Sequence, residues 1–250
     1  MSDIPTSKRI LLAFDEHDFT TGDQEFLQRI VGKGAGIKVG SVPMHARLKR
    51  DRRITVASAV GSFLQNFHRD AQRMDDPKLF EIPYVMGEAA RAIADSGAWG
   101  FTVHESNNDK GLEAAIKNCG TSLVIGVGIL TSFSKRDSSR SFGELPDVKA
   151  LDFAQRFAGV GGHALVCSGQ DLEMLNQSTL LRSLIKIVPG IRDSSDPPDD
   201  QMRTMTAFDA IVSGADYLVI GRPIRHAVNP EEAFDRFVSE IERGLAARSR

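Results

Sequence analysis

Charged side chains stand at the ends of the first three extended segments of the chain. Asp15 follows an apolar run, Lys38 interrupts a second, and Asp76 and Lys78 lie two residues apart in a third segment. Side chains two apart point to the same face of a strand. Each charge also has a simpler interpretation as a solvated rim residue, because charges inside strands are rarely buried unless paired. Their recurrence at three strand ends favours a functional array of alternating charge.

A second pattern is typical of phosphate binding. The apolar run 217–220 continues into Gly221 and Arg222, and the run 184–188 continues into Pro189 and Gly190, with Gln201 further along. The two runs lie about thirty residues apart, the length of one strand–helix unit. In a (β/α)₈ barrel the loops after the seventh and eighth strands frequently hold a phosphate group. The pattern therefore predicts a phosphate site on such a barrel.

Strand-like runs alternate with amphipathic helical patterns along the whole chain. This alternation predicts a parallel sheet joined by helices, and eight repeats are enough to close it. The length of 250 residues matches one such barrel. We therefore expect one α/β domain over residues 1–250, a single (β/α)₈ TIM barrel. The predicted strands cover residues 9–16, 35–41, 78–84, 100–106, 122–130, 163–168, 184–191 and 217–223.

Three segments break this rhythm. Residues 43–73 are basic at their start and helix-patterned, so an enlarged second helical layer is expected. Residues 131–146 are polar and serine-rich, and residues 193–203 are rich in proline and aspartate. These last two follow strand ends on the face where barrel enzymes carry their active sites. We interpret both as lids, which long loops in compact domains often form.

The overall composition argues against several classes of partner. A formal charge of −2 does not favour nucleic acid or an anionic membrane surface. No apolar run approaches the roughly 20 residues that span a bilayer. Residues 1–8 lack the apolar core of a signal peptide, so a cytoplasmic protein is expected. Cys119 and Cys167 form neither a disulfide framework nor a metal cluster, and we interpret both as structural.

Several short motifs occur in order along the chain, and together they are more specific than any one alone. They are Leu12-Ala13-Phe14-Asp15, Lys38-Val39-Gly40, Thr102-Val103-His104, Leu130-Thr131-Ser132, Pro189-Gly190-Ile191-Arg192, Asp200-Gln201-Met202-Arg203 and Gly214-Ala215-Asp216-Tyr217 through Ile224. With these motifs the chain resembles the orotidine 5′-phosphate decarboxylase family over nearly its full length. The family's D-x-K-x-x-D-I-P signature appears as residues 76–83, with Glu81 in place of the second aspartate.

The resemblance implies a barrel of the ribulose-phosphate-binding type and a specific reaction. Orotidine 5′-phosphate, a small-molecule nucleotide, would be decarboxylated to uridine 5′-phosphate in pyrimidine biosynthesis, with no metal and no organic cofactor. Asp76 would set its carboxylate against the substrate carboxylate, and Lys78 would protonate the carbanion at carbon 6. Lys38 and Asp15 would position the ribose and the charge array, and Ser132 would read the pyrimidine edge.

The same resemblance assigns the phosphate site and a quaternary structure. Gln201 and Arg222 would hold the phosphate, with Pro189 and Gly221 beside them. Glu81 lies five residues after Asp76, so its parity along a strand is opposite and it does not easily point into the same barrel mouth. In the family the matching acid reaches the partner subunit's active site. A homodimer with shared sites, and a catalytic role for Glu81, are therefore expected.

Two other functions stay open at this point. A divergent, non-catalytic barrel that binds nucleotide phosphates would keep Gln201 and Arg222 but lack the chemistry. Another sugar-phosphate lyase or epimerase of the same superfamily is the second alternative. Metal-dependent epimerases need paired His and Asp ligands at strand ends. The single H-x-D sequence, residues 68–70, lies in a helix-patterned segment, so no metal site is expected. We interpret His104 as a strand histidine with internal hydrogen bonds.

Overall fold

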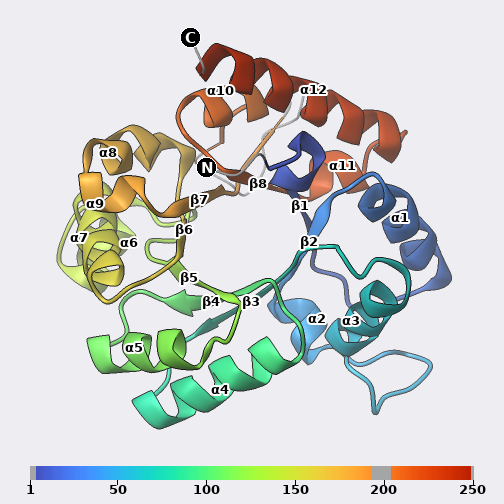
Figure 1. The fold of residues 1–250 in the computed structure, drawn as a ribbon, viewed down its shortest axis with the longest axis horizontal. Coiled ribbons are helices and arrows are strands. Elements are labelled where there is room, and N and C mark those ends of the chain that lie inside the picture. The colour runs from blue at the N-terminus through green and yellow to red at the C-terminus, as the bar shows by residue number, and fades with distance from the viewer. Residues whose placement is uncertain (1–3, 193–203, 249–250) are drawn as a thin grey trace.

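The computed structural model describes residues 4–192 and 204–248, and in them eight parallel strands close into a barrel in chain order. β1 pairs with both β2 and β8, which closes the ring. Figure 1 shows the helices arranged around the outside of the strands. The predicted (β/α)₈ barrel is therefore confirmed. The strands are β1 (Ile10–Phe14), β2 (Gly36–Val39), β3 (Arg73–Leu79), β4 (Gly100–His104), β5 (Leu123–Val127), β6 (Ala164–Val166), β7 (Ile185–Val188) and β8 (Tyr217–Ile220).

Several helices begin at residues whose side chains cap the helix N-terminus. Thr20 and Asp23 form a reciprocal capping box on α1, and Ser134 and Asp137 form another on α6. The α-helices are α1 (Thr21–Gly32), α2 (Ser41–His45), α3 (Val56–Phe67), α4 (Pro83–Asp95), α5 (Asp109–Asn118), α6 (Lys135–Phe142), α7 (Pro146–Gly159), α8 (Leu172–Gln177), α9 (Thr179–Arg182), α10 (Ala207–Val212), α11 (Arg222–Arg225) and α12 (Pro230–Arg248). Two 3₁₀ turns, η1 (Thr6–Arg9) and η2 (Gly169–Asp171), precede β1 and α8.

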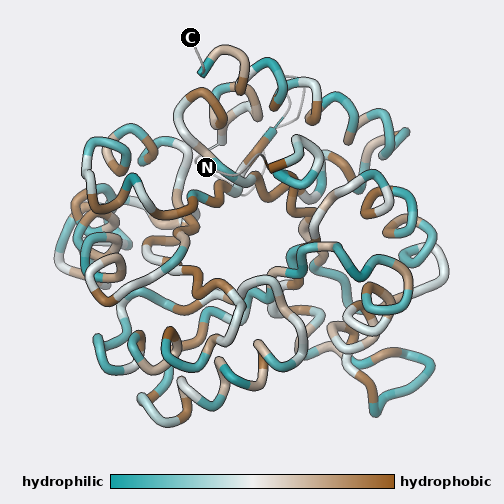
Figure 2. The backbone as a smooth tube through the Cα atoms, in the orientation of Figure 1, coloured by the Kyte–Doolittle hydropathy of each residue, from teal (hydrophilic) through white to brown (hydrophobic). Residues whose placement is uncertain are grey.

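The core has an inner part and an outer part. Inside the barrel, Leu11, Met74, Ile125, Ile187 and Tyr217 belong to one buried cluster. Two larger clusters fill the layer between the strands and the helices. In Figure 2 the hydrophobic colour follows most of the strand ring, while the outer turns of the helices are hydrophilic. The polar groups at the carboxyl ends of the strands stand out against this mostly apolar cluster.

The third strand lies elsewhere than predicted. We expected residues 78–84, but β3 covers Arg73–Leu79, and Pro83 starts α4. The prediction was wrong because residues 73–76 carry three charges and did not look like a buried strand. Their charges are paired instead: Arg73 Nε lies 3.0 Å from Asp75 Oδ1. The predicted ranges of the other seven strands all contain the observed ones.

The three irregular segments have different outcomes. Residues 43–73 contain the end of α2, all of α3 and a projecting loop between them, so the second helical layer is enlarged as predicted. Residues 131–146 contain α6 and the first residue of α7. Residues 193–203, the third segment, lie outside the described residues. None of the described helices is long and apolar enough to cross a bilayer.

Candidate active site

The carboxyl ends of β1, β2 and β3 bring four charged residues into one ion network. Lys38 Nζ lies 3.0 Å from Asp76 Oδ2 and 3.8 Å from Asp15 Oδ2. Lys78 Nζ lies 2.8 Å from the same Asp76 Oδ2. One carboxylate oxygen therefore contacts two ammonium groups, and the charges identified in the sequence meet in space.

Asp76 lies at the centre of this network and is held in its charged form. Its side chain is buried, and Thr102 Oγ1 donates a hydrogen bond of 2.8 Å to Asp76 Oδ1. Burial alone would raise the pKa of Asp76. The positive charges of Lys38 and Lys78, with the hydrogen bonds from Lys78 and Thr102, outweigh burial and hold that pKa below its ordinary value. The site thus contains a fixed negative charge that has already lost most of its water.

The backbone at Lys78 departs from regular strand geometry. Pro77 has no N–H to donate, and the pairing of β3 with β4 shifts register between Asp75 and Leu79. Lys78 has a φ of 51°, a left-handed conformation that costs a non-glycine residue roughly 1–2 kcal/mol. Its N–H donates to Thr102 Oγ1 at 2.8 Å. Thr102 therefore contacts both ends of the Asp76–Lys78 pair and supports the strained conformation between them.

A close approach between two strands sets the position of Asp15. Asp15 follows β1 directly, and its side chain is half exposed. Gly40 follows β2, and a Cβ atom there would lie 1.7 Å from Asp15 Oδ1. No side chain fits at that distance, so the glycine of the Lys38-Val39-Gly40 motif is needed for Asp15 to reach Lys38. The Lys38-Val39-Gly40 motif therefore supplies both a charge, at Lys38, and the space that Asp15 needs, at Gly40.

The ion network opens into a cavity of about 290 Å³. This volume is close to the lower end of the roughly 300–1,000 Å³ typical of small-molecule sites. Lys38, Asp76 and Lys78 line it together with Ser132 and Pro189, so five of the candidate site residues share one cavity. The apolar part of the lining comes from Met74, Val127, Ile129, Leu130, Val166 and Val219.

The remaining residues predicted to bind phosphate lie at the edge of this region or outside the description. Gly221 and Arg222 follow β8, whose Val219 lines the cavity. Arg222 is exposed and is the first residue of α11. Gln201 lies outside the described residues.

Glu81 is not among the residues that line the cavity. It lies two residues beyond the end of β3, and its side chain is exposed. Its backbone carbonyl accepts a hydrogen bond of 2.9 Å from Asn107 Nδ2. Asn107 is itself buried, so the loop after β4 holds the segment that carries Glu81.

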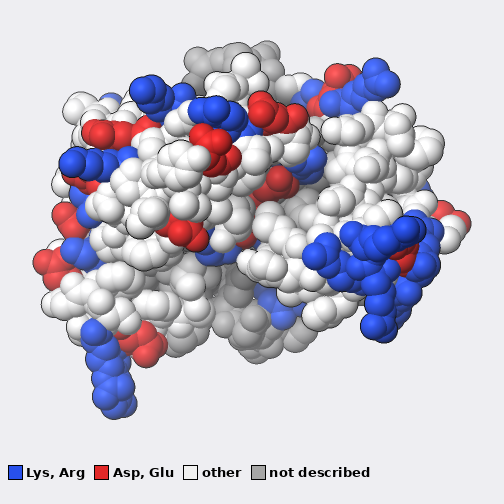
Figure 3. All heavy atoms as spheres, turned by 90° about the horizontal axis from the view of Figure 1, so that it is seen from below, with Lys and Arg blue, Asp and Glu red and all other residues white. Residues whose placement is uncertain are grey.

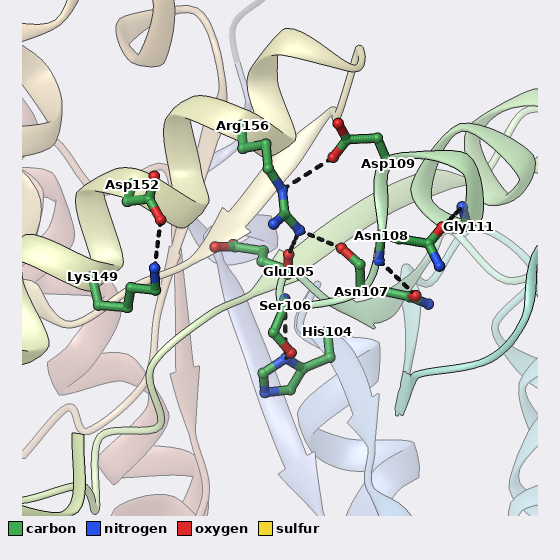
Figure 4. Close-up of polar contacts among 10 residues, drawn as sticks. All are labelled: His104, Glu105, Ser106, Asn107, Asn108, Asp109, Gly111, Lys149, Asp152 and Arg156. Carbon is green, nitrogen blue, oxygen red and sulfur yellow. Dashed lines mark hydrogen bonds and ion pairs between the residues drawn. The ribbon is translucent and has the colours of Figure 1, made fainter. Parts of the chain in front are cut away.

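An arginine on α7 holds that loop in turn. Arg156 donates to the backbone carbonyls of Glu105 and Asn107, and its Nε lies 3.1 Å from Asp109 Oδ1 (Figure 4). Sequence reasoning missed both Asn107 and Arg156. Neither belongs to a strand-end charge pattern, and Arg156 lies 51 residues away from Glu105 along the chain. The sequence singled out Thr102 only as part of the Thr102-Val103-His104 motif, and its contacts with Asp76 and Lys78 were not predicted.

Glu105 is a buried acid that sequence reasoning also missed. Its carboxylate packs against Gly126 and Gly128, where a Cβ atom would lie 2.5 Å from Oε1 and 2.7 Å from Oε2 respectively. Burial raises the pKa of Glu105 to about 8, although the charge of Arg156 opposes the shift. The side chain is therefore mostly protonated at neutral pH.

His104 makes the internal contact expected of it. Its Nδ1 lies 2.6 Å from Ser106 Oγ, and its ring meets Phe80 edge to face. Burial, assisted by the charge of Lys78, lowers the pKa of His104 below its ordinary value. Within the described residues, no group of three or more His, Cys, Asp or Glu side chains is arranged to hold a metal ion.

Comparison with known proteins gives one family. The model of the orotidine 5′-phosphate decarboxylase / HUMPS family matches residues 57–237. The orotidine 5′-phosphate decarboxylase of Methylococcus capsulatus is 37% identical over 182 residues, covering 72% of this chain and 74% of the relative. That of Laribacter hongkongensis is 35% identical over 211 residues, covering 82% and 85%. In fold, the chain is similar to the crystal structure of orotidine 5′-phosphate decarboxylase from Lactobacillus acidophilus, with a TM-score of 0.73 at 22% identity and coverage of 94% and 99%.

Proposed function

Because the chain belongs to the orotidine 5′-phosphate decarboxylase / HUMPS family, we propose that it decarboxylates orotidine 5′-phosphate to uridine 5′-phosphate in pyrimidine biosynthesis. The observation that carries this proposal is the pair of ammonium groups on one buried carboxylate, at 2.8 and 3.0 Å, facing a cavity of nucleotide-compatible size. As part of the same proposal, the enzyme acts in the cytoplasm, since its substrate and product are soluble phosphorylated nucleotides.

The proposed chemistry uses Asp76 and Lys78 against the reacting bond. With substrate bound, its carboxylate lies beside the fixed negative charge of Asp76, which favours its departure as CO₂. The carbon 6–carboxylate bond breaks, and its electron pair stays on carbon 6 of the pyrimidine. The Lys78 ammonium stabilises this developing charge and then transfers a proton to it. Lys78 is left neutral and regains a proton from solvent.

The other candidate residues bind the substrate in this proposal. Lys38 and Asp15 hold the ribose and complete the alternating charge array, while Ser132 reads the pyrimidine edge. The phosphate is bound by Gln201 and Arg222, with Pro189 and Gly221 at the neighbouring strand ends. The phosphate is remote from the bond that breaks, so its binding energy serves to hold the reacting group in position.

A direct assay tests the proposal. Purified protein is mixed with orotidine 5′-phosphate, and the loss of pyrimidine absorbance is followed as the carboxylate leaves. Turnover supports the decarboxylase. Tight binding of a product analogue with no turnover would favour the alternative of a non-catalytic barrel that binds nucleotide phosphates.

Arg222→Ala is expected to lower kcat/KM by roughly 10- to 100-fold, the effect of removing one charge-assisted contact to a dianion. The loss should become much smaller with a substrate that lacks the phosphate. Steady-state kinetics on both substrates measure the difference. Arg29→Ala, which removes an exposed ion pair with Glu231, is the matched control and should leave both rates unchanged. An equal loss on the two substrates would mean that Arg222 has only a structural role.

We also propose a homodimer with active sites shared across the interface. The segment around Glu81 supports this, because Phe80, Ile82 and Tyr84 expose 60%, 65% and 77% of their surface beside it. A cluster of exposed large apolar residues is typical of protein interfaces. A closed two-fold dimer is also the commonest oligomer. In this arrangement Glu81 lies next to the partner's Asp76 and Lys78.

Mixing two inactive variants tests the shared site. Glu81→Ala and Lys78→Ala homodimers should each have little activity. After subunit exchange, each heterodimer contains one site with both native groups, so activity should return to about a quarter of the wild-type value at equal mixing. Sedimentation measures the oligomeric state in the same samples. A fully active monomer, or no recovery after proven exchange, would refute the shared site.

A further inference from the structure

The loop between α2 and α3 is an ordered hairpin that projects from the barrel. Leu48 N donates to Ile54 O at 3.0 Å, and Val56 N donates to Ala46 O at 3.0 Å. Arg47 and Thr55 form an antiparallel bridge between these bonds. Figure 1 shows the loop extending outward from α2 and α3. Its backbone hydrogen bonds hold the side chains of residues 47–54 in a defined arrangement.

This hairpin concentrates positive charge. Five exposed basic residues occupy seven consecutive positions, with one acid among them: Arg47, Lys49, Arg50, Arg52 and Arg53, with Asp51. Arg53 pairs with Asp51 at 3.0 Å, which leaves the other four cations directed to solvent or to a ligand. Figure 3 shows them as a dense basic patch on one side of the molecule. In a chain whose formal charge is −2, such a patch is a local feature and not a general property of the surface.

An apolar groove of about 490 Å³ lies against the base of the hairpin. Its floor is formed by Phe19, Leu48 and Phe63, which are buried, and its sides include Ile54 and Phe67, which expose 40% and 63% of their surface. Phe19, Phe63 and Phe67 form a run of ring contacts with centroids 5.7 and 5.1 Å apart. Arg50 and Asp51 stand at the rim. None of the residues that line this groove lines the cavity beside Asp76.

We propose that the hairpin and the groove form a docking surface for an acidic segment of another protein. This segment inserts one or two apolar side chains between Ile54 and Phe67, and its carboxylates pair with the cations of the hairpin. Charge complementarity selects an acidic partner, and the apolar groove selects one with hydrophobic anchors. An amphipathic helix bound in a hydrophobic groove and an acidic motif bound by an arginine cluster are both known modes of peptide recognition.

The same observations disfavour the other occupants. A second copy docking through the same face would bring two basic hairpins together. The overall charge is slightly negative, whereas nucleic-acid-binding domains are usually strongly basic. A membrane surface does not fill a concave groove. Only one of the five cations lines the groove, so a small anion held there would leave most of the patch unused.

A fluorescein-labelled acidic peptide tests the proposal by fluorescence polarisation. The probe is a fourteen-residue peptide rich in Asp and Glu, with Leu and Phe four positions apart. It should bind with micromolar affinity, and raising the salt concentration from about 50 to 300 mM should weaken binding at least several-fold. The Arg50→Glu/Arg52→Glu variant should bind at least 10-fold more weakly, and so should Ile54→Ser. The double variant Lys110→Glu/Lys117→Glu, with the same change of net charge on exposed residues of α5, should bind like the wild type.

Three comparisons separate the proposal from its competitors. A peptide with both anchors replaced by alanine must bind at least 10-fold more weakly, since equal binding would reduce the surface to a polyanion site. The proposal would be overturned if single-stranded RNA or anionic vesicles bound more tightly than the peptide. It would also be overturned if the Arg50→Glu/Arg52→Glu substitutions dissociated an oligomer that the wild type forms. Failure of the peptide to bind at 100 µM would also overturn it. The hairpin variants should keep the far-UV circular dichroism and the thermal unfolding midpoint of the wild type, which verifies folding without relying on the proposed function.

Discussion

Replacing Lys78 with alanine is expected to lower decarboxylation by at least about 10³-fold, the combined size of lost general-acid catalysis and lost stabilisation of the developing charge. Lys78 Nζ is 2.8 Å from Asp76 Oδ2 and lines the cavity, and the proposed mechanism places the carbanion beside this ammonium. Binding of a neutral-ring nucleotide should be largely preserved, because the residues proposed to bind its phosphate follow β7 and β8 and are not changed. Binding of the charged substrate should weaken, because Asp76 then faces the substrate carboxylate with one counter-charge fewer.

The unusual backbone at Lys78 allows a sharper control. Glycine adopts a φ of 51° without the penalty paid by alanine or lysine. Lys78→Gly should therefore be more stable than Lys78→Ala by up to about 1–2 kcal/mol, yet equally inactive. Thermal unfolding and the absorbance assay measure the two properties separately. Lys33→Ala, which removes an exposed pair with Asp235, should remain fully active. Substantial turnover by either Lys78 variant would falsify the proposed mechanism.

Glu105→Gln is expected to stabilise the protein by an amount that grows with pH. The pKa of Glu105 is about 8 in the folded protein, against an ordinary value of 4.5. Between these two values the folded state binds a proton that the unfolded state has released. The free energy of unfolding of the wild type therefore falls by up to about 1.4 kcal/mol per pH unit between pH 4.5 and pH 8, and stays at the lower level above that.

Glutamine has nearly the same shape and does not titrate, so the variant should lack this slope. At pH 5 the variant should be more stable by less than about 1 kcal/mol. At pH 7 the variant should be more stable by a value on the order of 3 kcal/mol. Denaturant unfolding across pH 4.5–9 measures the difference. Glu113→Gln, an exposed substitution on α5, should shift stability by less than about 0.5 kcal/mol at every pH. Parallel pH profiles for wild type and Glu105→Gln would show that Glu105 does not titrate as its burial implies.

Decarboxylation by Glu105→Gln should stay close to the wild-type rate. Glu105 does not line the cavity beside Asp76, and Arg156 contacts its backbone carbonyl, which the substitution keeps. This retained activity distinguishes a change in stability from a change in the site.

Local patterns in the sequence were sufficient to predict the (β/α)₈ barrel and to identify charged residues of the candidate site. Strand and helix periodicities depend on neighbouring residues, so the eight repeats predicted a closed barrel. In α12, Phe234, Phe237 and Ile241 are buried, and their spacing of three and four residues is typical of an amphipathic helix. Parallel strands align their carboxyl ends, so charges at the ends of β1, β2 and β3 had to meet. Asp15 and Lys38 were therefore identifiable without coordinates, whereas the predicted third strand began at Lys78, so Asp76 and Lys78 were identified by their D-x-K motif.

The bounds of β3, and the contacts that hold the site residues in place, became clear only from the tertiary structure. Residues 73–76 carry three charges and so did not resemble a buried strand in the sequence, because the groups that pair with these charges are brought together only in the folded barrel. Thr102 reaches Lys78 across 24 residues, Asn107 reaches Glu81 across 26, and Arg156 reaches Glu105 across 51. The protonated state of Glu105 depends on its packing against Gly126 and Gly128. Hydrogen bonds and burial of this kind arise between segments distant in sequence, so no spacing rule along the chain encodes them.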